Sequence, residues 1–115
     1  MQEDGRVSGK VALVTGGAGG IGGASARLLA QEGAAVVIAD LLEEEGRSLE
    51  AQITEAGGRA LFVRLDVTDE EDWDRAIQAT LDSFGKLDVI VNNAGVSHRN
   101  GVEETTSDAW DWVMA

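Results

Sequence analysis

The sequence predicts an α/β protein built on a doubly wound parallel sheet. Three observations support this class: four apolar runs rich in β-branched residues, three intervening segments of helical period, and a glycine-rich stretch where the first run meets the first helical segment. Strands that alternate with helices favour a parallel sheet with right-handed crossovers. For four strands the doubly wound order is 3-2-1-4.

The four predicted strands cover residues 10–15, 34–40, 59–66 and 87–93. The first, second and fourth are nearly continuous apolar runs, as expected for strands that are covered on both faces. The order 3-2-1-4 places the fourth at an edge of the sheet, although its composition is that of a strand paired on both sides. An unprotected apolar edge pairs readily with another chain. We therefore expect the chain to self-associate through this strand or to be poorly stable.

The predicted helices are identified by apolar residues three and four positions apart. Their stripes are Ile21, Ala24, Ser25, Leu28 and Leu29, then Leu42, Leu49, Ile53 and Ala56, then Trp73, Ala76, Ile77, Thr80, Leu81 and Phe84. Gly33, Gly57 and Gly85 follow the three stripes, where a C-terminal cap belongs. Thr68 and Glu71 predict a capping box before the third helix. A fourth helical stripe begins with Trp110, Val113 and Met114.

Composition and charge exclude several kinds of function. Nine basic residues against 21 acidic ones give a formal net charge of -12, which repels phosphate backbones and anionic lipid. No apolar run approaches the roughly 20 residues of a membrane span, and no targeting signal is readable at the N-terminus. The absence of cysteine excludes disulfides and thiolate metal sites. We expect one cytoplasmic domain over residues 1–115 that binds neither nucleic acid nor membranes.

Six of the eight residues from Gly16 to Gly23 are glycine, at the junction of the first strand and the first helix. A flexible tether there would disconnect two elements that must pack closely. A nucleotide-binding loop instead needs glycine for a tight turn, for close approach of a pyrophosphate and for packing of the helix on the strand. The start of the helix then offers unpaired N–H groups and a positive dipole end to the phosphates.

Asp40 ends the second predicted strand, 18 residues after Gly22. This position corresponds to the carboxylate that accepts hydrogen bonds from the adenosine ribose of NAD. The same carboxylate would repel a 2′-phosphate, and no lysine or arginine stands at the neighbouring loop positions to offset it. The spacing therefore favours NAD over NADP. The alternative is a strand-end residue that faces solvent or caps the next helix.

With these residues gathered, the chain resembles the classical form of the short-chain dehydrogenase/reductase family, which has a Rossmann-type fold. The run from Thr15 to Gly22 matches the family's TGxxxGIG motif, and Asn92-Asn93-Ala94-Gly95 matches its NNAG motif. Asp66-Val67 resembles the pair that meets the adenine, and Trp110 resembles a tryptophan of the following helix. The motif selects the register Gly16, Gly20 and Gly22, with Gly17 and Gly19 as permissive neighbours. The resemblance covers residues 8–115.

The resemblance implies an NAD-dependent oxidoreductase that transfers hydride between nicotinamide and a small alcohol or carbonyl, in a homo-oligomer. Asp40 would hold the ribose, and Asp66 and Val67 would flank the adenine. The implied pyrophosphate residues are Gly16, Ala18, Gly19, Gly20, Ile21 and Gly22, and those of the cofactor cleft are Asn93, Ala94 and Gly95. In the family, part of the NNAG role is to brace the strands. Gly23 departs from the family, which usually carries a longer side chain there.

The family's catalytic residues have no counterpart in this sequence. The family uses a tyrosine in YxxxK, whereas this chain contains no tyrosine, and Lys10 and Lys86 lie outside any such motif. His98 is a candidate substitute acid, but a lone histidine in a polar loop is more often simply solvated. We therefore assign no catalytic residue. We expect the N-terminal, cofactor-binding half of a longer dehydrogenase, truncated before the C-terminal strands and inactive alone.

Two other classes of function stay open at this point. One is a non-catalytic module that binds a dinucleotide or dimerises without turnover, which the missing tyrosine and lysine favour. The other is a fragment or scaffold without a ligand, which the glycine loop and Asp40 oppose.

Overall fold

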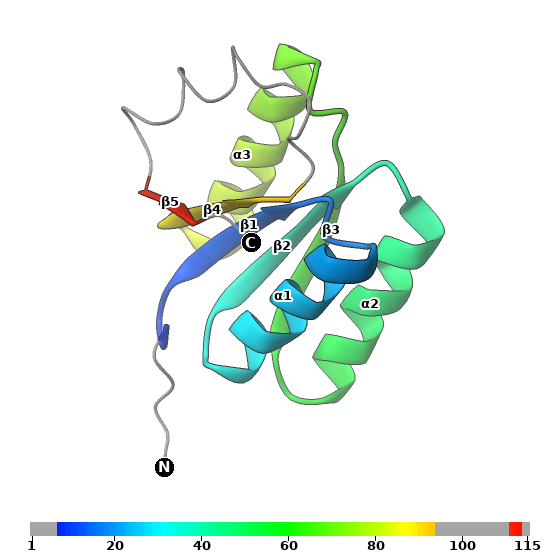
Figure 1. Cartoon of the computed structure of the whole chain (residues 1–115). Helices are drawn as coiled ribbons and strands as arrows, with labels where there is room; N and C mark the ends of the chain where they lie inside the picture. The colour runs from blue at the N-terminus through cyan, green and yellow to red at the C-terminus, as the bar shows by residue number, and fades with distance from the viewer. Residues whose placement is uncertain (1–6, 94–110, 114–115) are drawn as a thin grey trace.

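The computed structural model describes residues 7–93 and the backbone of residues 111–113 (Figure 1). Strands and helices alternate as the sequence predicts. The strands are β1 (Val11–Thr15), β2 (Ala35–Asp40), β3 (Arg59–Arg64), β4 (Val89–Asn92) and β5 (Asp111–Val113), and the helices are α1 (Gly20–Gln31), α2 (Glu43–Glu55) and α3 (Glu70–Phe84). No helix in this described part is both long and apolar enough to cross a membrane.

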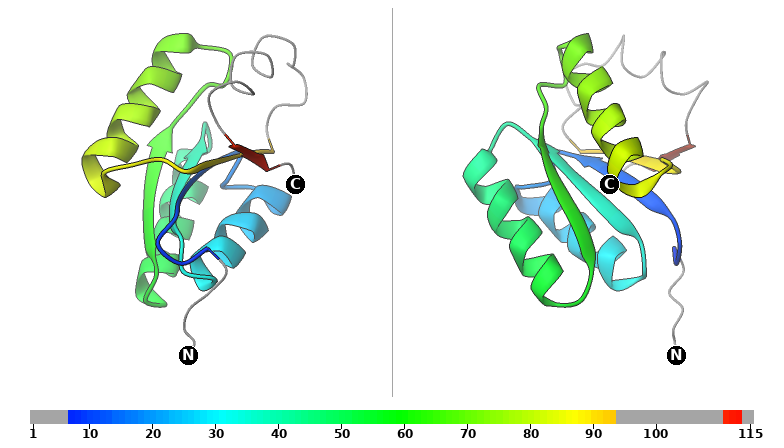
Figure 2. Two further views of the ribbon diagram at one scale, coloured as in Figure 1. Left: turned by 90° about the vertical axis from the view of Figure 1, so that its left-hand side faces the viewer. Right: turned by 180° about the vertical axis from the view of Figure 1, so that it is seen from behind.

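The strands form one parallel sheet in the order β3-β2-β1-β4-β5, which confirms the predicted order 3-2-1-4. Helices α1 and α2 cover one face of the sheet and α3 covers the other, as Figures 1 and 2 show. Each face carries its own apolar cluster, built around Val36 and Ile38 on the first and around Leu13 and Ile90 on the second. Because all strands run in the same direction, their carboxyl ends meet at one edge.

Strand β5 departs from the sequence prediction. Residues 111–113 pair in parallel with Val89, Ile90 and Val91 of β4, where the pattern predicts the start of a helix. Short apolar runs do not distinguish helix from strand by periodicity, and the unpaired backbone groups of β4 favour a strand beside them. The prediction that β4 is the exposed edge of the sheet is therefore wrong at these three positions.

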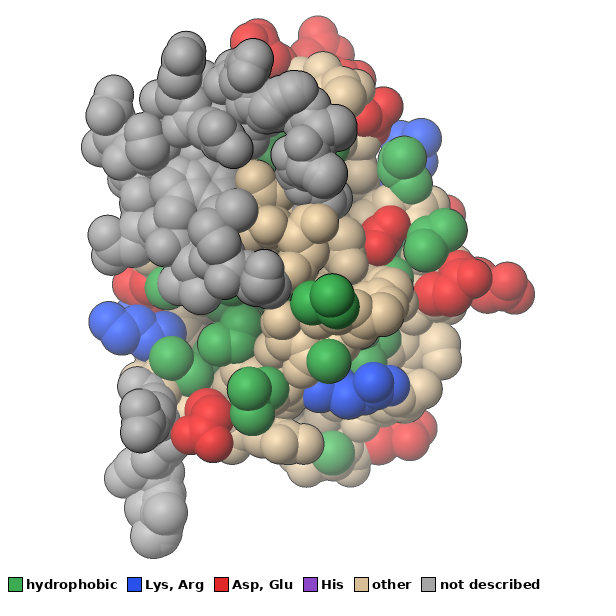
Figure 3. Space-filling model, in the orientation of Figure 1, with side chains coloured by type: hydrophobic (Ala, Val, Ile, Leu, Met, Phe, Trp, Pro, Cys, Tyr) green, Lys and Arg blue, Asp and Glu red, His purple; other side chains and the backbone are tan. Residues whose placement is uncertain are grey.

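The buried face of α1 also differs from the predicted stripe. Gly22, Gly23 and Ala26 are buried, whereas Ile21 is 72% exposed and Leu28 is 57% exposed. Small residues let the helix axis approach the sheet closely, and larger side chains on that face would hold it away. Figure 3 views the molecule from the side of α1, and exposed hydrophobic side chains accordingly lie on this face.

The other two helices follow their predicted stripes more closely. Leu49 and Ile53 of α2 are buried, and so are Ala76 and Thr80 of α3. The ends of the stripes do not follow the prediction, because Leu42, Ala56 and Leu81 are exposed. The central turns of α2 and α3 are thus buried as predicted, and Trp73 and Phe84 near the two ends of α3 are partly buried against the sheet.

The helix ends confirm the predicted glycine caps and correct the predicted capping box. Gly85 has a φ of +82° and its amide donates to the Leu81 carbonyl. At the start of α3 the N-cap is Asp69, whose side chain accepts from the Glu71 amide at 2.9 Å. The predicted cap, Thr68, instead donates its hydroxyl to Asp66.

Candidate functional site

The glycine-rich loop turns directly from β1 into α1. Gly16 has a φ of +65°, a conformation that favours glycine, and its amide donates to the Ala39 carbonyl at 2.8 Å. A Cβ at Gly22 would stand 1.9 Å from the Gly16 carbonyl oxygen, so no side chain fits there. These two glycines serve the turn itself and the contact between the loop and the helix.

Gly17, Gly19 and Gly20 of the loop fall into two groups. A Cβ at Gly17 would stand 2.8 Å from the Val14 carbonyl oxygen, so the prediction that Gly17 is a permissive neighbour is wrong. At Gly19 and Gly20 a Cβ would meet no atom of the described residues within 4 Å. Protein packing therefore does not require glycine at these two positions, and the missing side chains leave the start of α1 open.

The start of α1 is electrostatically different from the starts of α2 and α3. It has no acidic residue in its first turn and no side-chain cap at Gly19, whereas α2 and α3 each begin with three acidic residues. First-turn amides lack intrahelical acceptors and stand at the positive end of the helix dipole. In a chain of net charge -12, this end is suited to an external anion.

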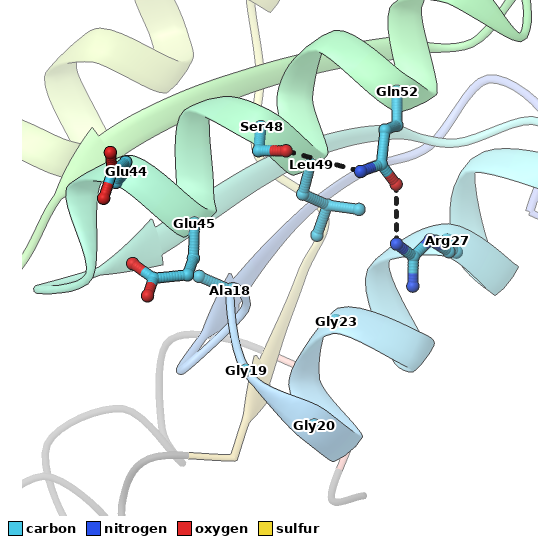
Figure 4. A pocket seen from close by; sticks show the side chains of 10 residues that line it. All are labelled: Ala18, Gly19, Gly20, Gly23, Arg27, Glu44, Glu45, Ser48, Leu49 and Gln52. Atoms are coloured by element: carbon cyan, nitrogen blue, oxygen red, sulfur yellow. Dashed lines mark hydrogen bonds between the residues drawn. The ribbon is translucent and has the colours of Figure 1, made fainter.

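A hollow of about 490 Å³ lies between α1 and α2 and adjoins the loop. Figure 4 shows the lining residues, among them Glu44, Glu45 and Arg27, which donates to Gln52 at 2.7 Å. Two carboxylates make the hollow unfavourable for a phosphate, and Asp40, Asp66 and Asn93 do not line it. Ala18, Gly19, Gly20 and Gly23 line the hollow on the side of α1, so the open first turn of this helix borders it and is the part of the lining suited to an anion.

Asp40 ends β2 beside the glycine loop, as the spacing predicts. One carboxylate oxygen accepts from the Ala18 amide at 3.0 Å and the other from the Leu42 amide at 3.0 Å. The side chain therefore ties the loop to the connection that leads into α2. A carboxylate has about four lone-pair sites, so this one can accept further hydrogen bonds from hydroxyl groups.

The ends of β1 and β4 are joined by the Thr15 hydroxyl. It lies 3.0 Å from the Asn92 side-chain oxygen and accepts from the Asn93 amide at 3.1 Å. The sequence identifies Thr15 as the start of the TGxxxGIG motif but does not predict this bridge. The indication of the bridge is structural: Thr15 is fully buried at the end of a strand. The side-chain nitrogen Nδ2 of Asn93 is buried and has no hydrogen-bond partner among the described residues. A buried donor without a partner is costly, so a ligand acceptor would suit it.

Asp66 and Val67 follow β3, and the Leu65 amide before them donates to the Asp40 carbonyl at 3.1 Å. The Thr68 hydroxyl and the Thr68 amide both donate to Asp66, at 2.6 and 3.0 Å. These hydrogen bonds, the hydroxyl first, lower the pKa of Asp66, and the charge of Arg64 adds to them against a partial opposing effect of desolvation. Asp66 is therefore ionised at neutral pH.

The described site thus brings the glycine loop, Asp40, Asp66, Val67 and Asn93 to the carboxyl edge of the sheet. The other candidates, Ala94, Gly95, His98 and Trp110, lie outside the described residues.

Comparison with known proteins identifies the family. The family model described as short chain dehydrogenase matches residues 10–115. The chain belongs to the short-chain dehydrogenase family. Its 2,5-dichloro-2,5-cyclohexadiene-1,4-diol dehydrogenase relative from Sphingobium indicum is 50% identical over 96% of this chain and 44% of its own length. The trans-4-hydroxycyclohexanecarboxylate dehydrogenase of Sinomonas cyclohexanicum is 52% identical over 91% of this chain and 43% of its own length.

A solved dehydrogenase structure agrees with the fold. The crystal structure of hydroxysteroid dehydrogenase from Escherichia coli superposes with a TM-score of 0.75 at 36% identity, over 78% of this chain and 37% of that one. The chain therefore spans less than half the length of the relatives it matches. The resemblance seen in the motifs is confirmed, and the chain corresponds to part of an oxidoreductase fold.

Proposed function

We propose that this chain is the cofactor-binding half of an NAD-dependent short-chain dehydrogenase. The observation that carries the proposal is the open space at Gly19 and Gly20, on a helix start that holds no acid. A pyrophosphate in that space would accept hydrogen bonds from the first-turn amides of α1. A side chain at either glycine would occupy the same volume.

The remaining site residues complete the cofactor's surroundings. Asp40 would accept hydrogen bonds from the adenosine ribose, and Asp66 and Val67 would flank the adenine. Nδ2 of Asn93, which has no partner among residues 7–93, would donate to the cofactor, and Ala94 and Gly95 would continue the same cleft. When bound, the nicotinamide would accept a hydride from an alcohol carbon or donate one to a carbonyl.

Titration of the chain with NADH, followed by nicotinamide fluorescence, tests the proposal. We expect saturable binding. Absence of binding at millimolar cofactor would contradict both the dehydrogenase proposal and the alternative of a non-catalytic dinucleotide-binding module. NADH binding by a complete protein that oxidises no alcohol would support the non-catalytic alternative.

The preference for NAD over NADP is tested at Asp40. Asp40→Arg should weaken NADH and improve NADPH, because the carboxylate that bonds the ribose and repels a 2′-phosphate is replaced by a cation. Since Asp40 also holds the Ala18 and Leu42 amides, Asp40→Asn is the matched variant that keeps an acceptor oxygen. We expect the arginine variant to shift the NADPH/NADH affinity ratio by more than roughly tenfold. An unchanged ratio would refute the role of Asp40.

The names of the relatives suggest a substrate class for the complete protein. They include dehydrogenases of a cyclohexadiene diol, a hydroxycyclohexane carboxylate and cyclopentanol. Each name specifies or implies a hydroxyl group on a non-aromatic ring. We propose that the complete protein is a homo-oligomer in the cytoplasm that oxidises an alicyclic alcohol, with this chain supplying the cofactor site.

A further inference from the structure

Two consecutive side chains near the start of α3 form hydrogen bonds to the segment after β3. The Asp72 carboxylate accepts a hydrogen bond from the Asp66 amide at 2.9 Å. The indole N–H of Trp73 donates to the Val67 carbonyl oxygen at 2.9 Å. Asp66 and Val67, the two residues that face the adenine in the proposed function, are thus each held at a main-chain atom by α3.

Asp72 is an unusual residue to find buried, because its carboxylate is charged and the residue is only 3% exposed. It forms ion pairs with Arg75 and with Arg64, whose side chains are 64% and 61% exposed. A buried carboxylate in an ion pair adds little net stability, because desolvation offsets the attraction. An apolar residue in its place would, however, leave the Asp66 amide without an acceptor. What Asp72 supplies here is a fixed anchor for the backbone of Asp66.

Trp73 combines packing with anchoring. Its ring packs against the apolar cluster on the α3 face of the sheet, while its N–H reaches the Val67 carbonyl. A phenylalanine fills much of the same space and has no donor. The two roles can therefore be separated by one conservative substitution.

We infer that Asp72 and Trp73 are positioning residues that set the preference of this site for adenine. The inference rests on the proposed function. An ionised Asp66 accepts a hydrogen bond from the exocyclic amine of adenine and repels a base with a carbonyl oxygen at that position. This discrimination depends on where the Asp66 carboxylate stands, and its backbone is held by α3. Asp72 and Trp73 would therefore act on the base only through Asp66 and Val67, to which they are hydrogen-bonded.

The test compares NADH with its reduced hypoxanthine analogue, which carries a carbonyl oxygen in place of the adenine amine. Both ligands report through nicotinamide fluorescence on the same chain. We expect wild type to bind NADH about tenfold more tightly than the analogue. Trp73→Phe and Asp72→Ala should bring this ratio close to one by weakening NADH alone. Asp72→Asn, which keeps an oxygen for the Asp66 amide, should retain the preference.

Phe84→Leu is the matched control, since Phe84 packs against the same cluster as Trp73 but at the opposite end of α3. It should leave the ratio unchanged, and circular dichroism checks that every variant folds. An unchanged ratio in Trp73→Phe and Asp72→Ala would overturn the inference, and so would an equal loss for both ligands. Wild type that binds both ligands equally well would also overturn it and leave the proposed function standing. Wild type that binds neither would overturn the proposed function itself.

Discussion

Gly20 and Gly23 stand three residues apart on α1 and differ in what surrounds the space above their Cα atoms. At Gly20 a Cβ meets no atom within 4 Å in the part of the chain that the structure describes, and at Gly23 it makes ordinary contacts of 3.5 to 3.8 Å with the loop and Leu49. Alanine in a helix is favoured over glycine by about 0.5–1 kcal/mol. We expect Gly20→Ala to raise the melting temperature and to lower NADH affinity at least about tenfold, because the new methyl enters the phosphate position.

Gly23→Ala is the control for this prediction. It should stabilise the chain by a similar amount, because its methyl fills space beside Leu49, but it should leave NADH affinity unchanged. Thermal melting and fluorescence titration measure the two effects. Equal NADH affinity in Gly20→Ala and Gly23→Ala would contradict the assignment of the open space to the cofactor.

For single residues, the spacing of a motif predicts where a residue stands in the fold better than it predicts which atoms that residue contacts. Asp40 ends β2 and Asp66 follows β3, close to their predicted places, but the bonds of Asp40 to the Ala18 and Leu42 amides depend on the path of the loop backbone. The Thr15 bridge and the close approach of Gly17 to β1 are likewise products of three-dimensional packing. The sequence pattern alone predicts neither the bridge nor the close approach.

At the start of α1 an added negative charge should have opposite effects on two quantities: it should raise the stability of the helix and lower the affinity for NADH. Ile21 lies in the first turn and is 72% exposed, so its replacement removes little packing. Ile21→Glu should stabilise α1 by about 0.3–1 kcal/mol, because an acid at a helix N-terminus complements the dipole. The same carboxylate would repel a pyrophosphate. We therefore expect NADH affinity to fall roughly tenfold or more, measured by titration at low salt.

Leu28→Glu is the matched control at the other end of the same helix. Leu28 is also exposed, at 57%, and the substitution adds the same charge two turns away from the loop. It should leave NADH affinity nearly unchanged, since screening removes most of the interaction between exposed charges beyond about 10 Å. An equal loss of affinity in both variants would mean that net charge, and not the helix start, is responsible.

The same helix explains why element types were predictable and their buried faces were less so. The predicted stripe from Ile21 to Leu29 has the correct helical period, but Ile21 and Leu28 are exposed and only Leu29 packs against the core. A hydrophobic pattern ranks large apolar residues above glycine, whereas the close approach of α1 to the sheet selects Gly22, Gly23 and Ala26 for the buried side. In α2 and α3 the stripe indicates the correct face, because Leu49 and Ile53 of α2 and Ala76 and Thr80 of α3 belong to it and are buried.

For the whole molecule, the order of the first four strands follows from alternation and handedness, which are properties of the chain as a sequence. The conformation of residues 111–113 does not. Three residues carry too little periodicity to decide between helix and strand, and the free edge of β4 decides it in favour of a strand.

The pairing of β5 with β4 predicts how the chain behaves when β5 is absent. Removal of residues 111–115 would uncover the hydrogen-bonding groups of Val89, Ile90 and Val91, and an unpaired apolar edge recruits strands from other chains. We expect sedimentation velocity to show self-association of the shortened chain at concentrations where the full chain is monomeric. Adding Val89→Lys to the shortened chain should restore the monomer, because a lysine on an edge strand opposes pairing. Equal association of the full and shortened chains would show that β5 does not protect this edge.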